Sequence, residues 1–92
     1  MTNINKYQVI RTALGKTQAE MTGAVGLSLR TIRTIEKDND VTDQTVAKYA
    51  AVTGIPEATI RTMDLRGMTY LEAIYYISTL MLMYRPKVGK AS

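Results

Sequence analysis

Residues 17–36 read TQAEMTGAVGLSLRTIRTIE, and this stretch decides the fold. Thr17 and Glu20 form a Thr-x-x-Glu capping box, in which each side chain satisfies the other's free backbone amide where a helix begins. Gly26 can take a positive φ at little steric cost, so we expect a tight turn there. Ser28 is a suitable cap for a following helix. The stretch therefore predicts two helices joined by a short turn.

Both predicted helices have apolar side chains at helical spacing, with Met21 and Val25 in the first and Ile32 and Ile35 in the second. Such a helical hairpin has two interpretations. It can be a packing device that any small helical bundle uses. It can also be a DNA reader, in which the second helix enters the major groove and the first crosses the DNA backbone.

The rest of the chain also shows helical patterns and no alternating strand pattern. The residues expected to mark helix ends are Gly15, Thr42, Gly54, Pro56, Thr69, Glu72 and Pro86. The apolar positions expected to face the core are Tyr7, Ile10, Ala13, Leu14, Val46, Tyr49, Ala50, Ile60 and Met63. The sequence thus predicts an all-α fold: a helix-turn-helix domain over residues 1–67, an apolar C-terminal helix over residues 68–85 and a disordered basic tail over residues 86–92.

The composition narrows the possible chemistry. The chain contains no cysteine and no histidine, so it lacks the thiolate and imidazole ligands of metal sites and the commonest general base. The sequence contains no recognisable nucleophile–base pair, phosphate-binding loop or carboxylate cluster. We therefore expect no catalytic residues, no metal and no cofactor. The sequence shows no secretory signal and no stretch that suits a bilayer, which favours a cytoplasmic protein that does not enter membranes.

The net charge of +4 comes wholly from the first third of the chain. Residues 1–35 carry five basic side chains and one acidic side chain, whereas residues 36–92 carry seven of each. This distribution is typical of a protein whose N-terminal part contacts a polyanion. A slightly basic surface without a function would give the same distribution.

Residues 17–36 resemble the helix-turn-helix of the Cro/cI-type family, which includes the lambdoid phage repressors and Cro proteins. The family pattern is Thr/Ser-Gln-x-Glu-Leu-Ala at the start of the first helix, Gly-hydrophobic-Ser/Thr at the turn and Ile/Leu-Glu at the end of the recognition helix. The matching positions in this chain are Thr17, Gln18, Glu20, Met21, Gly26, Leu27, Ser28, Ile32, Ile35 and Glu36. The resemblance implies a five-helix, lambda-repressor-like DNA-binding domain over about residues 3–66, with the apolar last helix outside it.

The resemblance also implies which residues contact DNA. They are Gln18, Ser28, Leu29, Arg30, Thr31, Arg33 and Thr34. Gln18 would bind a phosphate oxygen without reading sequence. Arg30 can donate two parallel hydrogen bonds to guanine, and Leu29 can pack on a thymine methyl group. Arg33 would contact a base or a phosphate, or lie in solvent.

Other residues affect how the DNA-contacting helices are held in place and how the nearby surface is charged. Arg11 and Glu36 match an ion pair of the family that fixes the first helix against the end of the third, and it serves orientation more than stability. Thr22 replaces the alanine that the family prefers, so its hydroxyl needs a partner. Gly23 in mid-helix should cost about 1 kcal/mol relative to alanine. Acids after the recognition helix would repel phosphate if they faced it; these acids are Asp38, Asp40 and Asp43.

Residues 70–84 are apolar nearly all round, so the last helix must be covered on more than one face. One interpretation is that it folds back and completes the core of the monomer. The favoured interpretation is that one face packs on the domain and another packs on a second subunit. The expected dimer contacts are Tyr70, Leu71, Ile74, Tyr75, Ile77, Leu80, Met81 and Tyr84.

These features predict a homodimeric, sequence-specific regulator that binds double-stranded DNA, a repressor of phage or mobile-element type that acts by occupying an operator. The alternative is a protein-interaction module, antirepressor-like or antitoxin-like. In that case the helix-turn-helix is a scaffold and the C-terminal helix binds a protein partner. The acids after the recognition helix favour this interpretation. Salt dependence separates the two, since phosphate contacts make DNA affinity fall steeply with salt.

Overall fold

The computed structural model describes residues 4–38 and 41–84, and every regular element in these ranges is an α-helix. The helices are α1 (Lys6–Ala13), α2 (Gln18–Val25), α3 (Leu29–Asp38), α4 (Asp43–Thr53), α5 (Glu57–Thr62) and α6 (Tyr70–Tyr84). The predicted all-α fold, with five short helices and a further apolar helix, is confirmed. The predicted basic tail and Asp40 lie outside the described residues.

The helix starts follow from local hydrogen bonds. Thr17 Oγ1 accepts a bond from the amide of Glu20 at 3.1 Å, and Glu20 Oε1 accepts one from the amide of Thr17 at 2.9 Å. Thr69 and Glu72 form the same reciprocal pair at the start of α6. Both predicted capping boxes are therefore present. Pro56 differs slightly from expectation, because it is the N-cap of α5 and lies just before its first turn.

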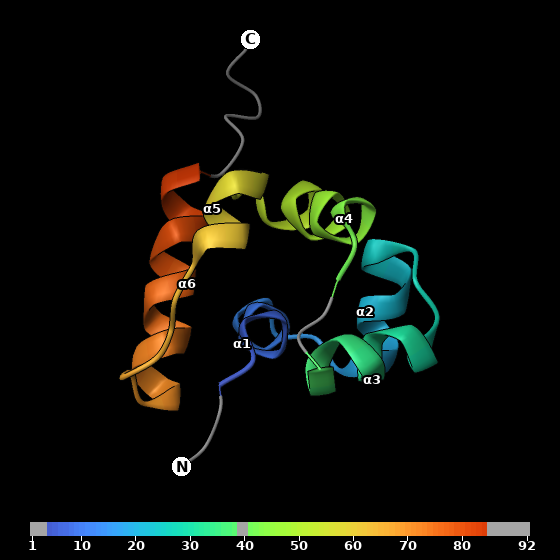
Figure 1. Cartoon of the computed structure of the whole chain (residues 1–92), viewed down its shortest axis with the longest axis horizontal. Helices are drawn as coiled ribbons and strands as arrows, with labels where there is room; N and C mark the ends of the chain where they lie inside the picture. The colour runs from blue at the N-terminus through green and yellow to red at the C-terminus, as the bar shows by residue number, and fades with distance from the viewer. Residues whose placement is uncertain (1–3, 39–40, 85–92) are drawn as a thin grey trace, which may run out of the picture.

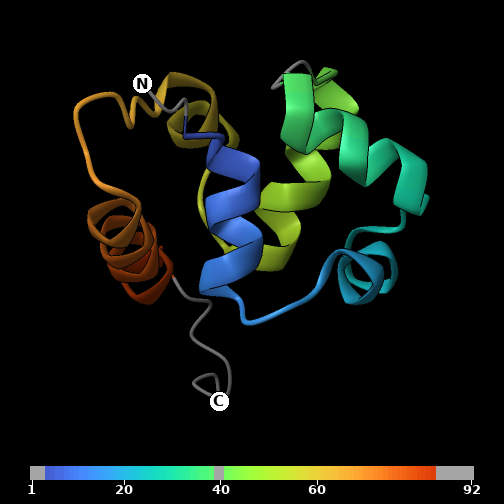
Figure 2. The ribbon, with the colours of Figure 1, turned by 90° about the horizontal axis from the view of Figure 1, so that it is seen from below.

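Helix α1 lies at the centre of the molecule. In Figures 1 and 2 it lies between α6 on one side and the pair α2–α3 on the other. Its buried side chains include Tyr7 and Ile10, and the ring of Tyr7 meets that of Tyr49 edge to face at 5.0 Å between centroids. The fully buried side chains with the largest volumes are Tyr7, Tyr49, Ile10, Met21, Ile32, Ile55, Ile60, Ile77, Val9 and Val46.

Helix α6 packs against α1 through one face only. Ala73 and Ile77 are fully buried on that face, and the hydroxyls of Thr12 and Tyr70 lie 3.0 Å apart in a hydrogen bond between the two helices. The sequence predicts Ile77 to be a dimer contact, and this prediction is wrong. Its side chain is enclosed within the monomer, so it is not available to a second copy. Within the described ranges, no helix combines the length and the apolar character needed to cross a membrane.

Candidate nucleic-acid interface

The hairpin of α2 and α3 is held by its buried side and by its turn. Met21 and Val25 of α2 and Ile32 and Ile35 of α3 are all buried in the core. Gly26 ends α2 with φ 71°, and its amide donates to the carbonyl of Thr22 at 2.8 Å. A left-handed residue at this point lets the chain leave α2 and enter α3 without a Cβ clash. The apolar sides of both helices therefore face inward and leave the outer side of α3 exposed.

Thr22 does not disturb the contact between the helices. Its Oγ1 donates to the carbonyl of Ala19 at 2.6 Å, one turn back along α2. The hydroxyl thus has the partner that a half-buried polar group needs.

A hydrogen-bonded network fixes α2 and α3 relative to α1. Arg11 Nε donates to Glu36 Oε2 at 2.6 Å and Arg11 Nη2 donates to Oε1 at 3.1 Å, while Nη1 donates to the carbonyl of Lys16 at 2.9 Å. The Glu36 side chain is only 6% exposed. The hydrogen bond to Glu36 raises the pKa of Arg11 above its usual value. This is the ion pair that the family resemblance implies, in a bidentate geometry that sets orientation as well as charge.

Gln18 joins this network, a contact that the sequence did not predict. Its Nε2 donates to Glu36 Oε1 at 3.0 Å. The side chain is half-buried at the first position of α2. Because an amide nitrogen has two N–H groups and the amide oxygen is a separate acceptor, one bond to Glu36 leaves hydrogen-bonding capacity for another partner.

The outer face of α3 presents side chains that the resemblance assigns to DNA contacts. Arg30, Arg33 and Thr34 are exposed, and Leu29 and Thr31 are half-buried. Among residues 4–38 and 41–84, no carboxylate forms an ion pair with either arginine. Two long cationic side chains therefore extend from one helix face, and none of the described carboxylates competes with an anion for them.

The hydroxyls of Ser28 and Thr34 at this face form hydrogen bonds with groups of α3 itself. Ser28 is exposed, and its Oγ caps α3 by accepting the amide of Thr31 at 3.1 Å and lies 2.9 Å from the hydroxyl of the same residue. Thr34 Oγ1 donates to the carbonyl of Arg30 at 3.1 Å. These bonds fix the rotamers of the small polar side chains. Each hydroxyl oxygen keeps lone pairs that a nucleic-acid donor can reach.

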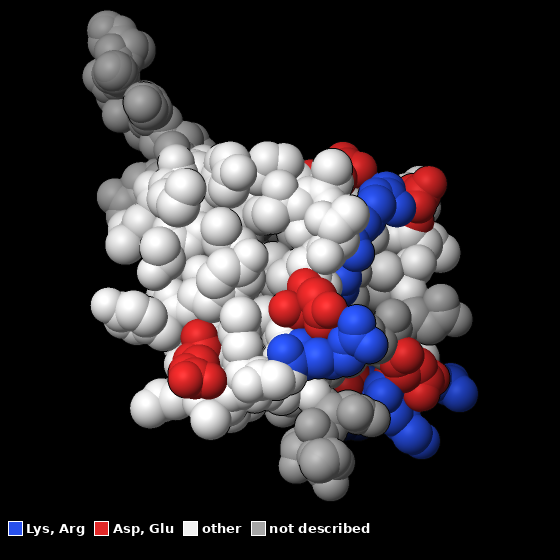
Figure 3. All heavy atoms as spheres, turned by 60° about the vertical axis from the view of Figure 1, so that its left-hand side comes forward, with Lys and Arg blue, Asp and Glu red and all other residues white. Residues whose placement is uncertain are grey.

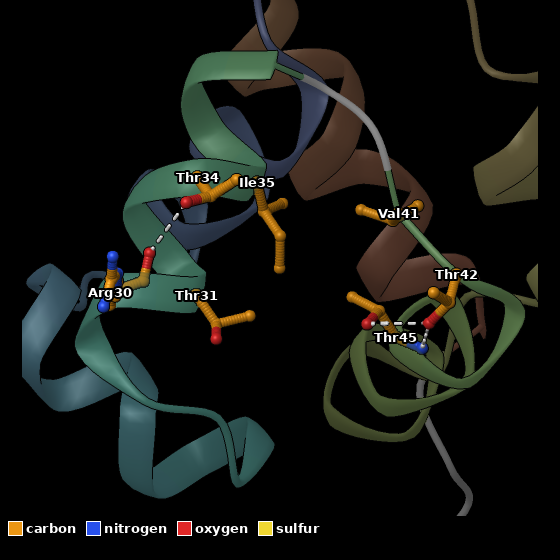
Figure 4. Close-up of a pocket in the computed structure, with 7 residues that line it drawn as sticks. All are labelled: Arg30, Thr31, Thr34, Ile35, Val41, Thr42 and Thr45. Carbon is orange, nitrogen blue, oxygen red and sulfur yellow. Dashed lines mark hydrogen bonds between the residues drawn. The ribbon is translucent and has the colours of Figure 1, made fainter.

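A shallow hollow of about 290 Å³ lies between α3 and the start of α4 (Figure 4). Its lining residues are Arg30, Thr31, Thr34, Ile35, Val41, Thr42 and Thr45. Among the described residues, the polar part of this lining is one guanidinium and four threonine hydroxyls, with no carboxylate. Thr42 Oγ1 accepts the amide of Thr45 at 3.2 Å and so caps α4 at the edge of the hollow. The sequence predicts Thr42 as a helix cap but does not show that this cap borders the surface.

One acid near this surface, Asp43, has a cationic partner. Asp43 Oδ1 lies 2.6 Å from Nη1 of Arg61, and Nη2 of the same arginine lies 3.5 Å from Oε1 of Glu57. The two side chains of the closer pair are 87% and 41% exposed, so the pair adds little to stability. It still gives Asp43 a cationic neighbour. Asp38 is exposed at the end of α3.

A buried contact that the sequence did not reveal connects the start of α1 with α3. Asn5 caps α1 by accepting the amides of Tyr7 and Gln8, and its Nδ2 donates to the carbonyl of Ile35 at 2.9 Å. One side chain therefore satisfies two helices, and it holds the end of α3 in place. The position of Asn5 just before an apolar helix is the local signal that indicates its capping role.

Comparison with known proteins agrees with this geometry. A protein-family model described as Helix-turn-helix matches residues 9–60, which is more than half of the chain. The match begins within α1 and ends within α5, so it contains all of α2, α3 and α4 and leaves out α6. No curated protein and no solved structure matches the chain.

Proposed function

Since the chain belongs to the XRE-like helix-turn-helix family of DNA-binding regulators, in which the Cro and cI proteins are found, we propose that it is a sequence-specific transcriptional repressor. The observation that supports this proposal best is the exposed face of α3. Arg30 and Arg33 extend from it without an ion-pair partner among the described residues. A recognition helix needs such donors at base edges and phosphates.

In the proposed complex, α3 enters the major groove. Arg30 donates two bonds to O6 and N7 of a guanine, and Leu29 packs on a thymine methyl group. Gln18, held by Glu36 at the start of α2, donates to a phosphate. The hollow beside α3 suits the phosphodiester backbone, because its polar lining groups other than Arg30 are threonine hydroxyls and its described residues include no carboxylate.

Operator occupancy is the mode of regulation that DNA binding alone can provide. A bound protein that covers an operator overlapping a promoter prevents transcription without any further effector domain. We propose a cytoplasmic repressor of the phage or mobile-element type, acting as a homodimer whose two copies of α3 read two half-sites. No catalytic step, metal or cofactor enters this mechanism.

The decisive experiment is selection of bound fragments from random double-stranded DNA, followed by sequencing. We expect one enriched motif with two-fold symmetry. Affinity for that motif should then fall linearly on a plot of log K against log salt, as phosphate contacts require. Absence of any enriched motif, together with DNA affinity that is negligible at low salt, would show that the protein is not a sequence-specific DNA binder.

A second candidate function is suggested by α6. Leu71, Tyr75, Leu82 and Met83 are each more than 60% exposed on this helix. A protein-interaction module of antirepressor or antitoxin type would use such a surface for a different partner. Tight protein binding with salt-independent, negligible DNA affinity would support this candidate over the repressor.

A further inference from the structure

The outward face of α6 carries a regular stripe of four residues. Leu71 is 75% exposed, Tyr75 77% and Leu82 65%, and Ser78 lies among them half-buried. Successive spacings along the stripe are four, three and four residues, which is the seam of a two-stranded helical pair. Ala73 and Ile77, which anchor α6 to the core, lie on the opposite side of the helix.

The chemistry around the stripe favours an uncharged partner. Glu72 is the single charged side chain between residues 70 and 84. Figure 3 shows a broad uncharged area on this side of the molecule, with one acidic patch at the lower left and the other acidic and basic side chains from the centre to the right of the view. A surface without cations does not suit DNA, and a helix seam of this kind suits another helix.

We propose that the occupant is α6 of a second copy of this chain, packed antiparallel across a two-fold axis. This proposal deepens the homodimer of the proposed function by naming its surface and register. In a two-fold contact, a residue that meets a given position must be met by the same residue in return. The midpoint between Leu71 and Leu82 and the midpoint between Tyr75 and Ser78 coincide, between residues 76 and 77. One antiparallel register therefore places Leu71 of each copy on Leu82 of the other. The same register places the large Tyr75 of each copy over the small Ser78 of the other.

The parallel arrangement lacks this fit. It would set Tyr75 against Tyr75 and Ser78 against Ser78, so that one layer is overfilled and the next is underfilled. It would also bring the two Glu72 carboxylates side by side. In the antiparallel register they are separated by roughly 14 Å along the helix axis, at 1.5 Å per residue.

The position of α6 leaves the DNA-binding surface open. Helix α1 lies between α6 and the α2–α3 pair in both ribbon views (Figures 1 and 2). A second copy on the stripe therefore places the two α3 faces toward the outer ends of the dimer. Pairing and DNA binding use different surfaces, so each can be removed by substitution without the other.

Cysteine cross-linking tests the register, because the chain has no cysteine of its own. Leu71→Cys and Leu82→Cys proteins are oxidised separately and as an equimolar mixture, then separated without reductant. A disulfide needs Cα atoms within about 7 Å. We expect a covalent dimer in the mixture at several times the yield of either protein alone. Equal or higher yield from Leu71→Cys alone would indicate a parallel pair and overturn the register. No covalent dimer in any sample would reject the seam.

Sedimentation tests the pairing itself. We expect the parent protein to dimerise with a dissociation constant on the order of micromolar, since a single helix covers less than the roughly 800 Å² per partner of a standard interface. Tyr75→Glu should weaken dimerisation at least tenfold, and Ala51→Glu, at an exposed position of α4, should not change it. Thermal unfolding of both variants checks that they fold. A parent that stays monomeric at 100 μM would overturn the pairing, whereas binding of a single DNA half-site would separately show that the DNA-binding function stands.

Discussion

Gln18 donates from its Nε2 to Oε1 of Glu36 at 3.0 Å, so the first residue of α2 is hydrogen-bonded to the last turn of α3. The same carboxylate binds Arg11 of α1 through two bonds. Three helices are therefore joined at one buried acid. The glutamine that would bind a DNA phosphate is thereby held in one orientation before DNA arrives, which lowers the entropy cost of the contact.

Replacing this acid should harm stability and DNA binding together. Glu36→Ala leaves the partly buried guanidinium of Arg11 without its counter-ion, and we expect a loss of about 3 kcal/mol in the free energy of unfolding. DNA affinity should also fall under conditions where the variant is folded, because Gln18 is no longer held. Urea unfolding followed by circular dichroism measures the first effect and fluorescence anisotropy the second. The double variant Arg11→Met, Glu36→Leu is the control, since it leaves no unpaired charge and should be more stable than Glu36→Ala. A change below about 0.5 kcal/mol for Glu36→Ala would contradict this account.

Gly23 should be a weak point in the stability of α2. A Cβ built at this position meets no atom within 4 Å, and the residue is exposed in a regular helical turn. Gly23→Ala should therefore raise the free energy of unfolding by about 1 kcal/mol. Gly26→Ala is the matched control: its surroundings are equally open, but φ is 71°. That variant should lose about 1 kcal/mol through backbone strain. Thermal unfolding distinguishes them, and equal shifts for both would refute the conformational explanation.

The sequence was sufficient for the parts of the fold that depend on neighbours along the chain. The capping box at Thr17 and Glu20 and the turn at Gly26 are local, because each involves residues within a few positions of one another. The apolar periodicity identified Ile32 and Ile35 as buried for the same reason. The helix-turn-helix was therefore predictable from the sequence alone.

What the sequence could not supply depends on residues brought together from distant positions. The contact of Gln18 with Glu36 and that of Asn5 with the carbonyl of Ile35 span 18 and 30 positions. Helix α6 shows the same difficulty. With apolar residues all round, its pattern did not reveal which side would meet α1, so Ile77 was assigned to a partner and Leu82 was not.

Arg30 should carry sequence discrimination without a structural role. Its side chain is exposed and forms no ion pair with another described residue. Arg30→Ala should leave the unfolding temperature unchanged, weaken operator binding by about 1–3 kcal/mol and relax specificity at one base position. Arg66→Ala is a control for the loss of one positive charge, since Arg66 is exposed and pairs with Asp64 outside α3. Binding to base-substituted operators gives the readout. Unchanged selectivity would show that Arg30 does not read a base.

Tyr49 should make the fold sensitive to alkaline pH. Burial raises the pKa of its phenol to about 12, with a smaller contribution from Glu36. Because the folded-state pKa lies above the unfolded value of about 10, the stabilising contribution is complete below pH 10 and is lost as the pH rises toward 12. Its hydroxyl has no hydrogen-bond partner among the described residues. Tyr49→Phe should therefore be nearly neutral at pH 7.

Between pH 7 and pH 11, the free energy of unfolding should fall less for Tyr49→Phe than for the parent protein. We expect the two decreases to differ by about 1 kcal/mol. Urea unfolding at pH 7 and pH 11 measures the difference between the two proteins at each pH. A large loss for Tyr49→Phe at pH 7 would mean that the hydroxyl makes a stabilising bond. An equal pH dependence in both proteins would mean that this phenol does not titrate differently on folding.

Two substitutions on α6 should separate the inward side of the helix from the outward side. Ile77→Ala opens a cavity where the side chain is fully buried. The free energy of unfolding should therefore fall by about 2–5 kcal/mol. Leu71→Ala removes a side chain that is 75% exposed, and the stability of the monomer should change by less than about 0.5 kcal/mol. Unfolding is measured at protein concentrations well below the dimer dissociation constant, so that pairing does not contribute. Leu71→Ala should instead shift the monomer–dimer equilibrium toward monomer at higher concentration. A large loss of monomer stability from Leu71→Ala would mean that this face is already covered within one chain, and that it is not available to a second copy.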